Sequence, residues 1–183
     1  MRLVSAAKAM LTVVVALLSA GLVVGRATGE EAGLTAEQVK GILSTTKNLR
    51  GKNLRGLDLT KIDMRGAQLI EADLGGAVLV EADLVGADLR RANLGGADLA
   101  QATLRGADLG EANLAGANLR GADLPQADLR RANLAGANLR GAVLAGADLE
   151  GANLAGADFS NAQLKGVRNL DKAKNLEQAR GLR

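Results

Sequence analysis

Carboxylates, amides and guanidinium groups are the side chains available for chemistry, because the 183 residues include no His and no Cys. That composition excludes disulfides, thiolate metal sites, Cys or His nucleophiles and imidazole acid–base catalysis. A carboxylate pair could still act as general acid and base, but such work needs a carboxyl whose pKa is shifted by burial or by a special partner. The aspartates instead recur in one slot of a regular pattern. We therefore expect a protein that is not an enzyme and has no catalytic residues.

Ligand binding by the same side chains is also not indicated. Calcium needs clustered oxygen ligands, and Gly95-Gly96-Ala97-Asp98 lacks the further Gly of the Gly-Gly-x-Gly-x-Asp calcium repeat. The adjacent arginines Arg90-Arg91 and Arg130-Arg131 could bind an anion, or could pair with acidic neighbours on the surface. We expect no metal and no cofactor.

These polar residues are positioned by a repeat of five. From Leu49 to Leu164 every fifth residue is Leu, Met or Phe, 24 in succession, and two residues earlier the chain has Ala in every repeat from Ala67 to Ala162. A period of five fits neither an α-helix of 3.6 residues per turn nor a straight strand, whose residues alternate between faces. The chain must therefore turn once per repeat, with Ala and Leu inward and the Asp or Asn between them outward.

The number of sides in one coil follows from two longer patterns. Gly fills the second corner position in 11 of 12 even-numbered repeats but in only 4 of 12 odd-numbered ones. The outward position of every fourth repeat is almost always Asn, as at Asn93, Asn113 and Asn133. Together these patterns predict a period of twenty, which means four sides per coil.

Runs such as Ala87-Asp88-Leu89-Arg90-Arg91 and Ala92-Asn93-Leu94-Gly95-Gly96 resemble the pentapeptide-repeat family over residues 47–166. The resemblance implies an all-β fold, a right-handed quadrilateral β-helix, and 24 repeats at four per coil give about six coils. The inward positions form the expected core. Its central part consists of Leu89, Leu94, Leu99, Leu104, Leu109, Ala87, Ala92, Ala97, Ala102 and Ala107.

Two surface groups are candidate sites. Glu71, Arg91, Glu111 and Arg131 alternate in charge at twenty-residue spacing, so they should form a charge ladder with neighbours about 4.8 Å apart. The exposed apolar residues Ile70, Val78, Val80 and Val85 could form an interaction patch, or could be scattered apolar residues of the ordinary kind.

The two ends of the chain differ from the repeat. Residues 1–27 resemble a signal peptide or an N-terminal membrane anchor, since Arg2 and Lys8 are followed by an uncharged stretch over residues 9–24. Residues 28–46 form a connector, and its capping box Thr35-Ala36-Glu37-Gln38 predicts a short helix over 36–44 that covers the first coil. Residues 167–183 have apolar residues six apart, which predicts either an irregular coil with six-residue sides or a capping helix over about 171–180.

The charge is unevenly distributed. Residues 1–62 carry a net charge of +5, residues 63–166 of −5 and residues 167–183 of +3. The basic ends therefore do not indicate nucleic-acid binding.

Two functions fit these observations. The first is a non-enzymatic scaffold, exported to a periplasm, a lumen or the medium or anchored facing outward, that presents flat faces to an unidentified protein partner. Membrane association would then use residues 9–24. The second is suggested by the family resemblance, because some members mimic DNA and act on DNA gyrase. Asp88, Asp108, Asp128 and Asp148 form a column of acids here, but arginines lie beside them.

Overall fold

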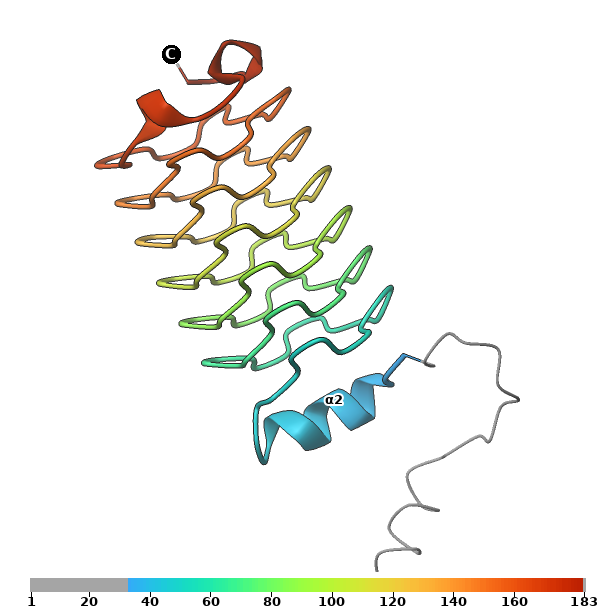
Figure 1. Cartoon of the computed structure of the whole chain (residues 1–183). Helices are drawn as coiled ribbons and strands as arrows, with labels where there is room; N and C mark the ends of the chain where they lie inside the picture. Colours follow the sequence, from blue (N-terminus) through green and yellow to red (C-terminus); the bar gives the residue numbers. More distant parts are fainter. Residues whose placement is uncertain (1–32, 183) are drawn as a thin grey trace, which may run out of the picture. The chain divides into compact units, whose positions relative to one another are not determined.

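A four-sided solenoid makes up most of the computed structural model, which describes residues 33–182 (Figure 1). Its coils stack in parallel through single β-bridges between residues twenty apart, the first four being Asn48↔Gln68, Asn53↔Asp73, Asp58↔Val78 and Asp63↔Asp83. The bridges therefore fall into four columns, one for each side of the coil. The period of twenty predicted from Gly and Asn is confirmed.

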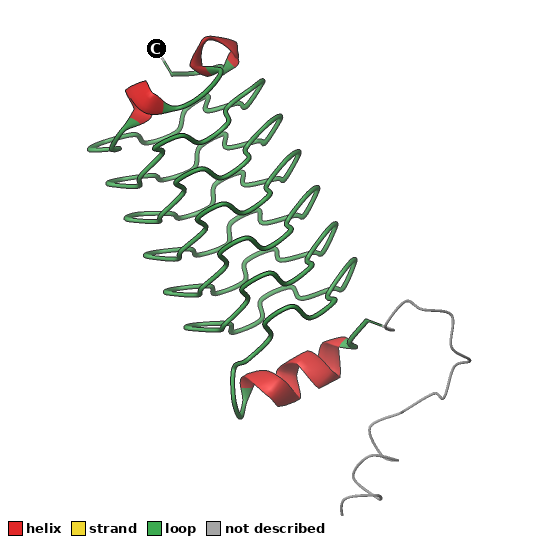
Figure 2. Ribbon diagram, viewed as in Figure 1, coloured by secondary structure: helices red, strands yellow, loops and turns green. Residues whose placement is uncertain are grey.

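Backbone hydrogen bonds explain why the repeat bends at each corner and pairs between coils. The Ala92 N–H donates to the Leu89 carbonyl (3.0 Å), which closes a β-turn, while the Leu89 N–H donates to Asp108 of the next coil (2.7 Å). The residue before Ala92, Arg91, has a φ of 58°, as the third residue of a type II turn requires. Each side is so short that it contributes one bridge residue, and Figure 2 shows loops and bridges rather than long strands.

The core is a narrow column of leucine and alanine inside the coils. It is continuous from the first coil to Phe159, the one aromatic residue of the chain, which is fully buried. The predicted central residues are all at most 1% exposed: Leu89, Leu94, Leu99, Leu104, Leu109, Ala87, Ala92, Ala97, Ala102 and Ala107.

Helix α2 (Ala36–Leu43) precedes the first coil and has both hydrogen bonds of a capping box. The Gln38 N–H donates to Thr35 Oγ1 (3.3 Å) and the Thr35 N–H donates to Gln38 Oε1 (2.8 Å). Val39 and Leu43 on its inner face are buried in the same core cluster as the first leucines of the solenoid.

At the other end the sides lengthen from five residues to six. The last bridges are Asp148↔Arg168, Asn153↔Lys174 and Asp158↔Arg180, and the longer corners contain the 3₁₀ turns η1 (Leu170–Lys172) and η2 (Leu176–Gln178). Residues 171–180 therefore form part of an irregular coil and not an α-helix. Leu170, Leu176 and Leu182 are partly buried against the core.

The signal peptide or anchor predicted over residues 1–27, its apolar stretch 9–24 and the start of the connector at 28–32 lie outside the described residues. Within residues 33–182, no helix has the length and apolar character to cross a membrane.

Candidate interaction surface

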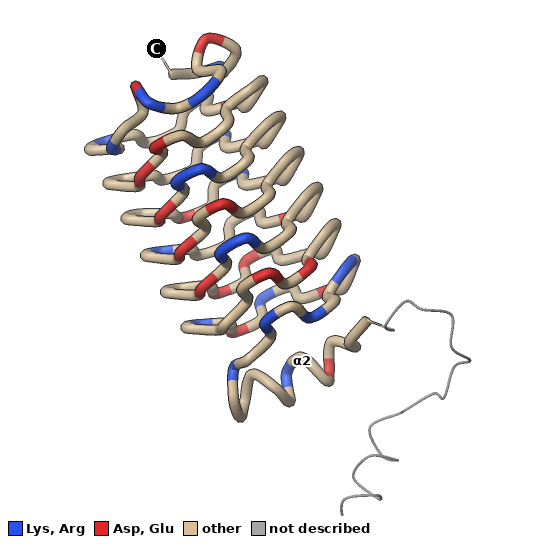
Figure 3. The backbone as a smooth tube through the Cα atoms, viewed as in Figure 1, with Lys and Arg blue, Asp and Glu red and all other residues tan. Residues whose placement is uncertain are grey.

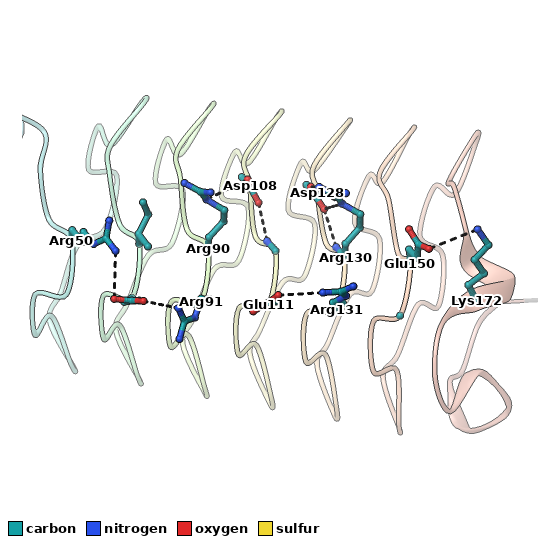
Figure 4. A pocket seen from close by; sticks show the side chains of 14 residues that line it. Arg50, Arg90, Arg91, Asp108, Glu111, Asp128, Arg130, Arg131, Glu150 and Lys172 are labelled. Carbon is teal, nitrogen blue, oxygen red and sulfur yellow. Dashed lines mark hydrogen bonds and ion pairs between the residues drawn. The ribbon is translucent and has the colours of Figure 1, made fainter.

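One side of the solenoid carries long charged side chains along its length, and Figure 3 shows acidic and basic segments alternating along it. We call this side the charged face and define it as the bridge column from Asn48 to Arg168 together with the two residues that follow each inward Leu, such as Arg90 and Arg91. A groove of about 830 Å³ runs along the face (Figure 4). The groove is lined by Arg50, Ile70, Glu71, Arg90, Arg91, Asp108, Gly110, Glu111, Asp128, Arg130, Arg131, Glu150, Gly151 and Lys172.

The predicted charge ladder occupies the corner of this face. Arg91 Nη1 lies 2.9 Å from Glu71 Oε1, and Arg131 Nη1 lies 3.6 Å from Glu111 Oε1. Arg50 Nη2 is a further, longer contact of Glu71 at 3.8 Å. Among the described residues no ion pair joins Arg91 to Glu111, so the ladder consists of two separate groups.

The ladder residues have a backbone conformation that favours glycine. Glu71, Arg91, Glu111 and Arg131 have φ between 58° and 60°, the left-handed region in which a Cβ atom is strained. The next side of the coil has Gly at this corner in every repeat from Gly56 to Gly156. The charged face therefore carries four consecutive long side chains where the backbone would accept glycine more readily.

A second row of ion pairs lies beside the ladder. Arg90 Nη2 lies 2.7 Å from Asp88 Oδ2, and its Nε lies 3.6 Å from Asp108 Oδ2. Arg130 pairs in the same way with Asp128. The hydrogen bond from each arginine holds the pKa of Asp88 and of Asp128 below the usual value of an aspartate.

Asp148 continues this row toward the C-terminal end and is the most buried charged residue described, 8% exposed. Burial by itself raises the pKa of a carboxyl. Two groups act in the opposite direction: Asn169 Nδ2 donates to Asp148 Oδ1 (2.8 Å), and Arg168 Nη2 lies 3.7 Å from Asp148 Oδ2. The balance lowers the pKa of Asp148. These aspartates are thus ionised and held by donors, which suits recognition of a charged surface better than proton transfer near neutral pH.

The row is interrupted at Gly110, between Arg90 and Arg130. A Cβ at Gly110 would lie 3.1 Å from Asp108 Oδ1, and the Gly110 N–H donates to that oxygen (3.0 Å). The position is therefore a gap between two long arginine side chains. Within residues 33–182 no group of three or more His, Cys, Asp or Glu residues is arranged to hold a metal ion.

The four apolar candidates lie on three different sides. Ile70 lines the groove of the charged face, Val78 and Val80 belong to the bridge column of Asp58, two sides away, and Val85 belongs to the side that follows theirs. All four side chains are half-buried. The structure thus separates Ile70 from Val78 and Val80, and a patch around Val78, Val80 and Val85 stays a prediction.

An amide ladder on the neighbouring side was not predicted. Asn113 Nδ2 donates to Asn93 Oδ1 (2.9 Å), Asn93 Nδ2 donates to Asp73 Oδ1 (2.8 Å), and Asn133 continues the series by donating to Asn113 (3.1 Å). The Asn113 side-chain oxygen also accepts the Ala115 N–H (3.2 Å). The five-residue repeat predicts only that these side chains point outward, although the run of Asn at twenty-residue spacing was the signal for their stacking.

Comparison with known proteins finds solved structures built from the same repeat. No curated protein matches the sequence. Among solved structures, HetL, a pentapeptide-repeat protein involved in heterocyst differentiation regulation in Nostoc sp. strain PCC 7120, is 31% identical, with 73% of each chain covered and a TM-score of 0.30. Rfr23, a pentapeptide-repeat protein of Cyanothece 51142, is 29% identical over 79% of this chain and 97% of its own, with a TM-score of 0.42.

A pentapeptide-repeat protein of the Arabidopsis thaliana thylakoid lumen is 29% identical over 73% of this chain and 78% of its own, with a TM-score of 0.31. The family profile described as pentapeptide repeats matches eight copies, over residues 48–84, 67–106, 92–131 and 132–168. The match covers most of the chain, and the protein belongs to the pentapeptide-repeat family.

Proposed function

We propose that this protein is a non-enzymatic scaffold, exported or membrane-anchored, whose charged face binds a protein partner. In this proposal the repeats form a right-handed β-helix of about six coils, and α2 covers its N-terminal end. The solenoid is the rigid support, and the side chains at its corners are the recognition elements. No cofactor or metal takes part.

The four left-handed residues of the charge ladder are the observation that carries the proposal. A non-glycine residue in this conformation costs about 1 kcal/mol relative to glycine, and exposed ion pairs return less than about 1 kcal/mol each. The ladder is therefore poorly explained by stability alone. The same holds for Lys61, Glu81 and Gln101 on the opposite side, but these three residues do not line the groove. Long charged side chains that line a groove can, by contrast, give electrostatic complementarity to a protein partner.

The pattern of charge favours a protein partner over a nucleic acid. Seven acidic and seven basic side chains line the groove or belong to its bridge column, so the face offers no continuous basic surface for phosphates. They are Glu71, Asp88, Asp108, Glu111, Asp128, Asp148 and Glu150, against Arg50, Arg90, Arg91, Arg130, Arg131, Arg168 and Lys172.

DNA mimicry is the alternative function, and the column of Asp88, Asp108, Asp128 and Asp148 is the observation in its favour. Arg90 and its counterparts pair with these acids, so the column lacks the unbroken negative charge of a phosphate backbone. We expect no inhibition of DNA gyrase supercoiling by the protein. Inhibition abolished by neutralising the four aspartates would favour mimicry instead.

Export is supported by the sequence of residues 1–27. A chain with a C-terminal tag should appear outside the cytoplasm after cell fractionation. Mass determination of its N-terminus should show cleavage near residue 27 for a signal peptide, or an intact N-terminus for an anchor. A tagged chain found only in the cytoplasm would overturn this part of the proposal.

Partner binding is tested with a variant that removes the ladder but keeps the fold: Glu71→Gly, Arg91→Gly, Glu111→Gly and Arg131→Gly together. The matched control replaces Lys61, Glu81 and Gln101 by Gly, three left-handed residues on the opposite side of the coil. Full-length tagged chains are cross-linked in the cells that produce them, and bound proteins are identified by mass spectrometry. We expect the control to keep the partners of the natural chain and the ladder variant to lose them. Identical partners for both variants would refute the role of the charged face.

A further inference from the structure

When the ladder is read in the reverse direction, the charge at every position is opposite to the charge found there in the forward direction. From the N-terminal to the C-terminal end the corner of the charged face reads Glu71, Arg91, Glu111, Arg131. A second copy that runs in the opposite direction, face to face, sets Glu71 against the second copy's Arg131, and Arg91 against its Glu111. Every opposing pair in the ladder then has opposite charges.

The neighbouring row is compatible with the same reversal. Reversal about the same point sets Arg50 against the second copy's Glu150, which is another pair of opposite charges, and Ile70 against its Arg130. It also sets Arg90 against the second copy's Gly110, so the long arginine side chain would lie over the gap in the row. Neither of these two rows opposes like charges, and both reverse about one centre. The bridge column sets Asp88 against the second copy's Asp108, but in each copy both carboxylates are already paired with Arg90.

We propose that two copies of this chain associate through the charged face as an antiparallel pair, related by a two-fold axis that crosses the face between Arg91 and Glu111. Such an interface is isologous, because the same surface serves both copies. This inference rests on the proposed function in taking the charged face as a protein-binding surface, and it names a second copy as the occupant.

The single chain leaves the required charges accessible. Arg91, Glu111 and Arg131 have exposed side-chain fractions of 64%, 52% and 75%, and Arg91 and Glu111 are not paired with each other within the described chain. Across the two-fold axis Arg91 gains the second copy's Glu111 as a partner. The equal numbers of acidic and basic groups along the groove and its bridge column also remove the net repulsion that two like-charged faces would have.

A parallel arrangement is less favourable. Parallel rods in register set each coil level with its own copy, so each ladder residue lies level with a residue of its own charge, as Glu111 does with the second copy's Glu111. The antiparallel arrangement instead sets opposite charges against each other along the ladder. Because the contacts are exposed ion pairs on one narrow side, we expect a weak association that high salt disrupts.

Cysteine cross-linking tests the arrangement, because the natural chain has no Cys. Gly51 and Gly151 are the outermost corner positions of the face and oppose each other in the antiparallel pair, whereas two copies of Gly51 would be about 24 Å apart at 4.8 Å per coil. Both have positive φ, as Glu71 does, and a Cβ at either position meets no atom closer than 3.5 Å. The substitutions Gly51→Cys and Gly151→Cys therefore leave the charged rows intact.

Full-length chains carrying one or the other substitution, with different tags, are purified together in mild detergent and oxidised at low salt. We expect a disulfide between Gly51→Cys and Gly151→Cys chains, and little between two chains of the same kind. Cross-links chiefly between identical chains would show a parallel pair. No cross-link from chains with a natural melting temperature would show that the face does not self-associate. Either result overturns the proposal.

Charge reversal provides the second test. Glu111→Lys should lower the yield of the Gly51→Cys to Gly151→Cys cross-link by about tenfold, because the introduced lysine would face the second copy's Arg91. Adding Arg91→Glu restores opposite charges across the axis and should restore the yield. A yield unaffected by either change would contradict a charge-matched interface. If cross-linking fails while the ladder variant still loses its cellular partners, the proposed function stands and only self-association is refuted.

Discussion

At the scale of single residues, the corner position determines both the shape of the solenoid and the character of each side. The second corner residue has positive φ, whether it is Gly116 on one side or Glu111 on another. The fold therefore sets the backbone conformation, and the residue type decides only how much strain is carried. Sides with glycine at this position carry no side chain there, while the charged face carries long charged side chains at the cost of some backbone strain.

A pair of reciprocal substitutions measures that strain. Glu111→Gly should change the free energy of unfolding by less than about 1 kcal/mol, because relief of the left-handed backbone offsets the lost ion pair with Arg131. Gly116→Glu should lower it by about 1 kcal/mol, since the site has φ of 66° and open space around the new Cβ. Urea unfolding of both variants at neutral pH provides the measurement, and equal losses of stability would contradict the account.

Acid sensitivity is a second consequence at this scale. The pKa of Asp88 and of Asp128 is lower in the folded protein than the ordinary 3.8, because Arg90 and Arg130 donate to the carboxylates. Their contribution to stability is therefore complete above pH 3.8 and is lost as the pH falls through the folded-state pKa. The double variant Arg90→Ala, Arg130→Ala should lose less stability than the natural chain between about pH 4 and pH 2. Parallel curves in urea titrations over this range would refute the assignment.

At the scale of one side of the coil, alanine and leucine have different structural roles. The leucines fill the interior and the alanines line the inner corner, and Ala107 and Leu109 are both at most 1% exposed. A larger residue at the alanine position must push neighbouring coils apart, whereas a smaller one at the leucine position leaves a local cavity.

We therefore expect Ala107→Leu to be more damaging than Leu109→Ala. The cavity variant should lose about 2–5 kcal/mol. The overpacked variant should exceed this loss, because strain at one corner disturbs the hydrogen bonds to both adjacent coils. Thermal melting of both variants compares them, and an equal or smaller shift for Ala107→Leu would reject the expectation.

The amide ladder makes a directional prediction. Each Asn donates toward the N-terminal end, and the series ends on Asp73, which only accepts. Asn113→Asp would place a carboxylate oxygen against Asn93 Oδ1 and remove one donor, at a cost of about 1–3 kcal/mol. Protonation of the new carboxyl restores the donor, so the deficit relative to the natural chain should shrink as the pH falls below about 5. Asn93→Asp should lose more stability at neutral pH, because its carboxylate would face that of Asp73, and its deficit should also shrink in acid. In urea titrations a deficit independent of pH would exclude this explanation.

At the scale of the whole molecule, much of the architecture can be predicted from the sequence because the same inward packing of Leu and Ala repeats many times. The five-residue spacing of Leu and Ala predicts the bend at each corner, and the distribution of Gly and Asn predicts four sides. The hydrogen bonds of the Asp and Asn side chains were missed, since residue type does not show whether an outward amide turns to water or to its neighbour along the stack. Ile70 and Val80 were grouped in one patch, although ten residues correspond to two sides of the coil and place the two residues on opposite sides.

Removal of the last coil is the prediction for the molecule as a whole. A chain that ends at residue 166 loses the partial cover that Leu170, Leu176 and Leu182 give the core. Since each coil of a solenoid is stabilised by its neighbours, we expect a lower melting temperature and faster aggregation. Light scattering during thermal unfolding compares the two chains, and unchanged behaviour would mean that the last coil has no covering role.

The change from five-residue to six-residue sides near the C-terminus has a consequence for polymer growth. Stacked parallel bridges are also the architecture of cross-β fibrils, in which each layer templates an identical one above it. A final layer with longer sides, containing η1 and η2, no longer matches the perimeter of the first layer of another molecule. We expect the mismatch to oppose head-to-tail fibre formation at the last layer, so that a sequence made of many near-identical repeats remains a particle of fixed length.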